Sequence, residues 1–262
     1  MLTVRPEQDD ESGYLLNMTR PQPRLEHEFS KTLTGFLAYR LEYDHLNNVP
    51  SATVRLFQDF QRKGVLSGCG GGLLWNTSND PLNPTASGIT SFSAEQGGGL
   101  LGGEFNFYKL QGGVKRYHRI SSQIVLASRL RLGFANPVSG SAAVPLFERF
   151  YARGANSVRG YGRRRLGPLS SANDPIGGRS LIEGSLELRR PLFKIGGALF
   201  LDFGQVSLHS FDVPLDDLRF APGFGVSYAT PVGPIRLDLG FPLDLPRGDQ
   251  PWQVHFRIGQ FF

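Results

Sequence analysis

The stretch LIEGSLELRRP, residues 181–191, alternates apolar and polar side chains along most of its length. Its apolar positions of one parity are Ile182, Leu186 and Leu188, and its polar positions of the other parity are Glu183, Ser185, Glu187 and Arg189. Successive side chains of a β-strand point to opposite faces, so this spacing predicts a strand with one apolar face and one polar face.

The same alternation recurs in three other stretches: GFLAYRLEYD (35–44), SQIVLASRLRLG (122–133) and PIRLDLGF (234–241). The 262 residues include 33 glycines, 18 prolines and 20 phenylalanines but only two methionines, a composition that favours turns and strands over packed helices. The sequence therefore predicts an all-β fold.

A soluble sandwich and a membrane barrel both use alternating strands, so the pattern alone leaves both open. Two features favour the membrane. Several segments are about ten residues long, which suits a tilted strand crossing a bilayer. Aromatic residues also gather near strand ends, as in interfacial girdles; they are Tyr14, Tyr39, Tyr43, Tyr108, Tyr117, Tyr228 and Trp252.

We predict a transmembrane antiparallel β-barrel of about 12 strands over residues 12–262, preceded by a short N-terminal tail at 1–11. Its first strand is expected near 12–20, and one hairpin near 102–114 and 118–133. A long loop is predicted at about 134–179, and a loop of that length in a compact fold is usually functional.

The predicted loop contains NSVRGYGRRRLGPL (156–169), which gathers four arginines and three glycines. SVRGYGRR, within it, resembles the V/I-R-G-F/Y signature of the BamA/TamA outer-membrane barrel superfamily, the bacterial surface antigen family. Four more stretches resemble its motifs in the same order: NDPLNPTASG (79–88), EGSLELRRPLF (183–193), ALFLDFGQV (198–206) and VHFRIGQFF (254–262). Asn79 stands where the family commonly has arginine, which puts an ionic role of that position in doubt.

The resemblance implies that the loop folds back into the lumen and that Val158, Arg159, Gly160 and Tyr161 form a loop-lock motif. By strand parity Asp202 and Glu187 point inward, so they are the expected lumenal acidic partners of Arg159. The terminal stretch resembles a C-terminal β-signal, carried here by Phe256, Ile258, Gly259 and Phe262. Arg163, Arg164 and Arg165 are expected in a solvated extracellular loop that contacts lipopolysaccharide phosphates.

The family implies a barrel of about sixteen strands and preceding POTRA domains that receive clients. We find only about seven strands before the long loop and too few residues before the first strand for a POTRA module, so the chain resembles a shortened member lacking POTRA domains or a part of a longer one.

The function that the resemblance implies, and that we prefer, is assisting the insertion, assembly or translocation of outer-membrane proteins through a lateral seam between the first and last strands. The alternative is a passive channel or a structural, lipid-perturbing barrel. The expected location is the bacterial outer membrane, with membrane lipids, lipopolysaccharide and unfolded outer-membrane proteins as partners.

Enzymatic and nucleic-acid functions find no support in the sequence. No G-x-S-x-G or H-E-x-x-H motif is present, and the single cysteine, Cys69, cannot form an intrachain disulfide or a cysteine zinc cluster. The net charge of +5 comes from arginines scattered through strands and not from one basic stripe. We therefore expect no catalytic site, no metal, no cofactor and no nucleic-acid partner.

Overall fold

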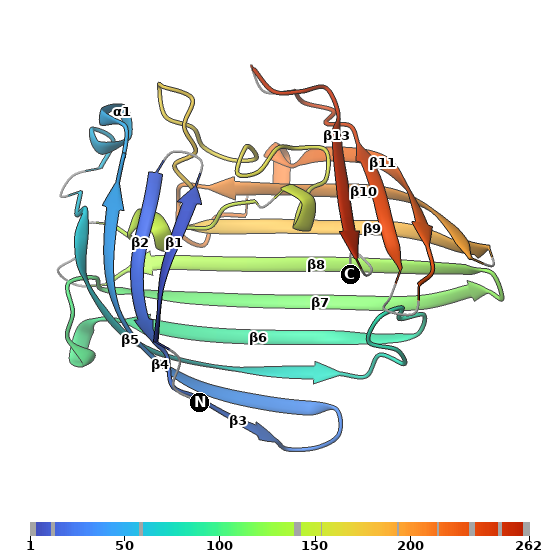
Figure 1. Ribbon diagram of the computed structural model, residues 1–262, viewed down its shortest axis with the longest axis horizontal. Helices are drawn as coiled ribbons and strands as arrows, with labels where there is room; N and C mark the ends of the chain where they lie inside the picture. Colours follow the sequence, from blue (N-terminus) through green and yellow to red (C-terminus); the bar gives the residue numbers. More distant parts are fainter. Residues whose placement is uncertain are drawn as a thin grey trace.

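The computed structural model describes residues 4–11, 14–57, 60–138, 143–152, 154–192, 194–213, 215–230, 234–245 and 248–258. These residues form one antiparallel sheet of thirteen strands (Figure 1). The strands are β1 (Val4–Glu11), β2 (Tyr14–Pro21), β3 (Arg24–Glu28), β4 (Leu33–Asn47), β5 (Lys63–Asn76), β6 (Ser87–Gly97), β7 (Phe107–Ser121), β8 (Ile124–Pro137), β9 (Ser180–Leu192), β10 (Ile195–Ser207), β11 (Arg219–Tyr228), β12 (Ile235–Gly240) and β13 (Gln253–Ile258).

The helical segments of the described residues are short: α1 (Ser51–Val54), η1 (Gly99–Leu101), η2 (Leu146–Glu148), η3 (Gly154–Asn156) and η4 (Leu215–Asp217). Within the described part of the chain, no helix has the length and apolar character that a membrane crossing requires. The all-β prediction is confirmed.

The strands pair in sequence order from β1 to β13, except that β3 lies off this path (Figure 1). β2 pairs with residues 43–47 of β4, and β3 pairs with residues 34–38 of the same strand. Pro21 ends β2, and Pro23 lies between β2 and β3. Because proline has no backbone N–H to donate, the hydrogen-bonded pairing with β4 is interrupted between these two strands. β1 and β13 stand at the two ends of the order.

Two element boundaries differ from those expected from the sequence. Residues 4–11, expected to be a tail, form β1 and pair with β2 along its whole length. VRPEQDDE shows no apolar alternation, so a strand was not expected there. β1 forms through its backbone pairing with β2. The central hairpin turns at 122–123, later than expected, since backbone pairing of β7 with β8 continues through the polar stretch that begins at Lys115.

Burial in the sheet is inverted relative to a water-soluble protein. The buried side chains of the strands include many charged or polar ones: Glu42, Asp44, Glu183, Ser185, Glu187, Asp202, Arg236 and Asp238. Their neighbours along the strands are exposed and apolar: Leu41, Tyr43, Leu186, Leu188, Leu201 and Leu237. A polar inner face and an apolar outer face are typical of strands that cross an outer membrane.

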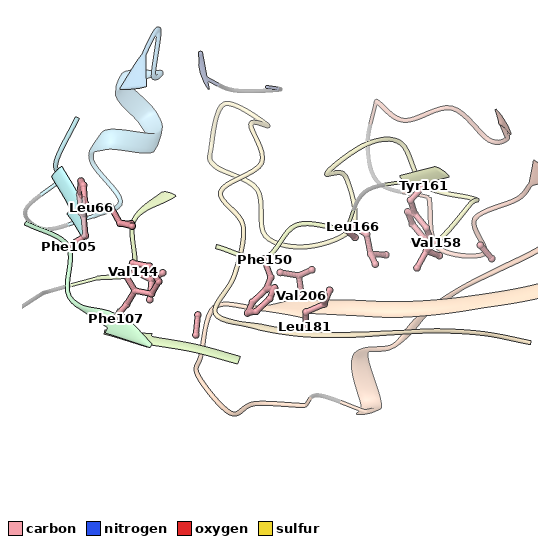
Figure 2. Packing of buried hydrophobic residues seen from close by; sticks show 13 residues of the cluster. Leu66, Phe105, Phe107, Val144, Phe150, Val158, Tyr161, Leu166, Leu181 and Val206 are labelled. Carbon is pink, nitrogen blue, oxygen red and sulfur yellow. The ribbon is translucent and has the colours of Figure 1, made fainter. Parts of the chain in front are cut away.

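The segment between β8 and β9, residues 138–179 where described, packs on the polar, inner face. Its side chains make contacts with strands as far apart as β4 and β12, so the sheet curves around it. Figure 2 shows the apolar cluster that the segment builds with the wall. Val158, Tyr161 and Leu166 of the segment lie at one end of this cluster, and Leu66 and Phe105 lie at the other.

Candidate functional site

Arg159 of the long loop is fully buried and lies among carboxylates of the strand wall. Its Nε and Nη2 donate to the two oxygens of Asp202 at 2.7 and 2.8 Å, a bidentate pair. Nη1 donates to Glu187 Oε2 at 2.7 Å and lies 3.5 Å from Asp238 Oδ2, and Nη2 reaches Ser185 Oγ at 3.3 Å. Bidentate arginine–carboxylate pairs are strong and geometrically specific, so the wall fixes both the position and the orientation of this side chain.

The backbone around Arg159 is held as well as its side chain. Its backbone N–H donates to Asp202 Oδ2 at 2.9 Å, and its carbonyl oxygen lies 2.7 Å from His255 Nε2 of β13. The guanidinium also stacks over the Phe200 ring, 3.3 Å from the centroid. The loop is thus joined to β9, β10, β12 and β13 at this one residue.

Glycines at two facing positions allow this close approach. A side chain at Gly160 would meet Ala221 Cβ at 2.5 Å and the Phe241 backbone at 2.9 Å. A side chain at Gly240, on β12, would meet the Arg159 carbonyl at 2.7 Å. The loop and the wall touch through backbone, so any larger residue would push them apart.

The carboxylates that face Arg159 belong to a wider ion-pair network in the wall. Glu187 also accepts from Arg236 at 2.7 and 2.8 Å and from Arg189 at 2.7 Å, and Arg236 Nε donates to Asp238 at 2.7 Å. The network therefore joins carboxylates of β9, β10 and β12 to arginines of β9, β12 and the loop. Sequence reasoning did not select Arg236 and Asp238, although the alternation of PIRLDLGF already placed both on the polar face.

A second ion-pair cluster ties the start of the loop to the other side of the sheet. Glu148 in η2 accepts from Arg40 of β4 at 2.6 Å and from Lys109 of β7 at 3.1 Å. Arg40 also binds Glu95 at 2.6 Å and Glu42 at 3.0 Å. Burial raises the pKa of Glu148, but Lys109 and Arg40 outweigh it and hold that pKa at about 2. The loop thus spans the concave face, anchored through Glu148 at one side and through Arg159 at the other.

No local pattern could have identified Glu148 as the second anchor. Its partners lie on strands that are 108 and 39 residues away in sequence, and it is the single acid of the stretch VPLFERF (144–150). Arg40 and Glu42 did fall on the polar parity of GFLAYRLEYD, so their inward direction, though not their partner, was readable from the sequence.

The remaining residues of the motif stretch all lie in the loop but differ in burial and contacts. Val158 and Tyr161 are both buried in the apolar cluster. Arg163 is exposed, as a solvated loop requires. Arg165 instead donates to Asp249 at 2.7 Å and to the Asn173 carbonyl at 2.8 Å, so it is held within the protein.

In the turn between β5 and β6, the uncharged side chain of Asn79 makes three hydrogen bonds. Its Oδ1 accepts from the backbone N–H groups of Thr85 and Ala86 at 2.9 and 3.0 Å, and its Nδ2 donates to Thr85 Oγ1 at 2.9 Å. Asp80 Oδ1 accepts from the backbone N–H groups of Asn83 and Leu82, which lowers the pKa of Asp80. Both side chains close the turn by local hydrogen bonds.

At the C-terminal strand, Phe256 and Ile258 are 67% and 65% exposed and lie on the apolar outer face. Gly259 and Phe262, the other two residues of the expected β-signal, lie outside the described residues. Across the described ranges, no group of histidine, cysteine or acidic residues has the arrangement of a metal site.

Comparison with known proteins gives consistent results. The chain is 31% identical over 231 residues to the outer membrane protein assembly factor BamA of Nitratidesulfovibrio vulgaris, covering 86% of this chain and 29% of that protein. It is 27% identical over 215 residues to a SAM50-like protein of Schizosaccharomyces pombe, covering 76% of this chain and 44% of that protein. The chain thus spans less than half the length of either relative.

Among solved structures, the fold is similar to BamA of Haemophilus ducreyi lacking POTRA domains 1–3, with a TM-score of 0.80 and 18% identity over 97% of this chain and 57% of that one. A second similar structure is CdiB of Acinetobacter baumannii, with a TM-score of 0.56 and 16% identity over 93% of this chain and 42% of that one. The model of the Omp85 superfamily domain matches residues 4–262. The chain therefore belongs to the Omp85 superfamily.

Proposed function

We propose that this chain is a transmembrane barrel of the bacterial outer membrane that assists the insertion or assembly of other outer-membrane proteins. The observation that carries the proposal is membership of the Omp85 superfamily together with similarity to relatives named outer membrane protein assembly factor BamA. The inverted burial of the sheet supports the membrane location. In this proposal the exposed apolar face contacts lipid and lipopolysaccharide, and the role is not enzymatic.

The barrel closes, in this proposal, by a seam between β1 and β13. Within the described residues, which end at Ile258, β12 and β13 have six residues each, whereas β7 and β8 have 15 and 14. A short pairing has few backbone hydrogen bonds, and an exposed strand edge can accept a client strand by β-augmentation. Because β1 is the edge strand, the seam lies at Val4–Glu11 and not near residues 12–20, where the first strand was expected from the sequence.

The long loop acts as a lock across the lumen in this proposal. Arg159 joins it to β9, β10, β12 and β13, and Glu148 joins it to β4 and β7, on the N-terminal side of the sheet. A loop anchored on both halves would hold the wall in shape while the seam opens. The motif residues Val158, Arg159, Gly160 and Tyr161 would supply one anchor, with Asp202 and Glu187 as its acidic partners.

A liposome experiment separates this function from a passive channel. Purified protein is reconstituted into liposomes, a urea-unfolded outer-membrane barrel is added, and client folding is followed by gel mobility without heating. Faster folding than in empty liposomes supports the proposal. Leakage of an entrapped small solute with no change in the rate of client folding would assign the chain to the channel class instead.

A further inference from the structure

A basic cavity on the concave side of the sheet is used by neither loop anchor. It has a volume of about 310 Å³ and lies against β6, β7 and β8 and the loop. Its charged lining residues are Lys115, Arg129, Arg131 and Glu183. Three cations therefore share the cavity with one carboxylate.

Strand register brings the three cations together. Lys115 of β7 lies directly opposite Arg129 of β8, and Arg131 is two residues further along β8 on the same face. Like charges placed opposite each other on adjacent strands destabilise a sheet. This pairing is therefore unfavourable unless negative charge lies close to it.

Among the residues that line the cavity, one carboxylate, Glu183, faces the three cations. Glu183, opposite Arg131, accepts from Arg131 at 3.2 Å and from the Ser157 hydroxyl. Arg129 donates to the loop carbonyls of Asn156 and Ser157 at 2.9 and 2.8 Å, and the carboxylates of Glu183 and Asp202 lie close enough to act on its charge. Lys115 has no hydrogen-bond or ion-pair partner within the part of the chain that the structure describes.

We propose that the basic cavity binds a small oxyanion of the phosphate class, with Lys115 as its principal contact and Arg129 and Arg131 contributing positive charge. Ser91 and Ser93 of β6 also line the cavity and offer hydroxyl donors to the same ion. Charge-assisted hydrogen bonds to an oxyanion are stronger than neutral ones, and a confined site screens them less than bulk water does.

The side of the sheet distinguishes free phosphate from a lipid phosphate group. Arg129 meets the loop carbonyls of Asn156 and Ser157, and Lys115 lies opposite Arg129, so these cations face the side of the sheet that carries the loop. Val114 and Leu130 also border the cavity, although their side chains are partly exposed. Because the cations face the loop side, we expect the ligand to be a soluble anion.

Calorimetric titration with inorganic phosphate, on the full chain in dodecyl maltoside at constant ionic strength, tests the site. Saturable binding is expected, with at least a tenfold loss of affinity in Lys115→Gln. Arg119→Gln is the matched control, because Arg119 lies on the same strand but outside the cavity, hydrogen-bonded to Thr85 at 2.8 Å. Absence of saturable binding, or equal loss in both variants, would overturn the proposal.

A second variant and a second titrant complete the test. If Lys115→Gln does not fold, as judged by heat-modifiable gel migration, Ser91→Asp places a carboxylate in the cavity and should abolish phosphate binding in a folded protein; retained binding contradicts the site. Short-chain phosphatidylglycerol is the second titrant, and binding that depends on Lys115 would make a lipid the ligand and refute the soluble anion. Neither readout depends on client folding, so failure of this site and failure of the proposed function are distinguishable.

Discussion

Replacement of Arg159 by alanine should release the long loop from the wall. Glu187 would keep Arg189 and Arg236, and Asp202 would keep the Ser185 hydroxyl and the backbone N–H of residue 159. Asp202 alone loses its charged partner while remaining fully buried. Breaking a buried ion pair from one side costs about 3–5 kcal/mol, and the retained hydrogen bonds point to the lower end of that range.

A cost of about 3 kcal/mol corresponds to a roughly hundredfold larger population of the undocked loop. Proteinase K cleavage between residues 154 and 165 reports this population when opening is fast relative to cutting. We therefore expect a cleavage rate about one hundred times that of the wild type. Arg159→Lys should lie between the two proteins, because lysine keeps the charge but loses the bidentate fork.

Arg163→Ala is the matched control, since Arg163 belongs to the same loop and is exposed. Its cleavage rate should stay close to that of the wild type. Equal rates for Arg159→Ala and Arg163→Ala would refute the docking of the loop through Arg159.

Three further predictions concern other parts of the chain. The pKa of Glu148, at about 2, lies below its ordinary value of 4.5, so its stabilising contribution is present above pH 4.5 and is lost as pH falls toward 2; the difference in melting temperature between wild type and Glu148→Gln should shrink over that range, and a constant difference would contradict the ion pairs. Asn79→Ala removes three hydrogen bonds from the β5–β6 turn and should lower the free energy of unfolding by about 1–3 kcal/mol in urea titrations, whereas an unchanged midpoint would show that the turn closes without it. Deletion of Phe262 should reduce the amount of protein in the outer membrane, measured by fractionation and immunoblotting, and normal levels would argue against a β-signal.

Strand parity, which is readable from the sequence, gives the direction in which a strand side chain points. Glu187 and Asp202 were placed inward by counting residues along a strand, and the structure brings both within 2.7 Å of Arg159. The motif resemblance drew attention to Arg159, but its contacts with His255 and Asp238 depend on how β12 and β13 pair, which parity does not define.

Features that depend on pairing without a side-chain pattern were missed. β1 has no apolar alternation and is ordered by hydrogen bonds to β2. Its local sequence pattern therefore predicted a tail at residues 1–11 and not a strand. Glu148 is a single acid in an apolar stretch, and only the curvature of the sheet brings it to Arg40 and Lys109. Long-range contacts of this kind require the register of the whole sheet.

Lateral opening of the proposed seam is tested most directly by a reversible covalent staple. Single cysteines are introduced in β1 (Val4–Glu11) and in β13 (Gln253–Ile258), with the exposed Cys69 replaced by serine, and pairs that cross-link on oxidation are selected. In liposomes, the oxidised protein should retain its folded gel mobility but no longer accelerate the folding of an unfolded barrel client, and reduction should restore the acceleration. Full acceleration by completely cross-linked protein would contradict opening between β1 and β13.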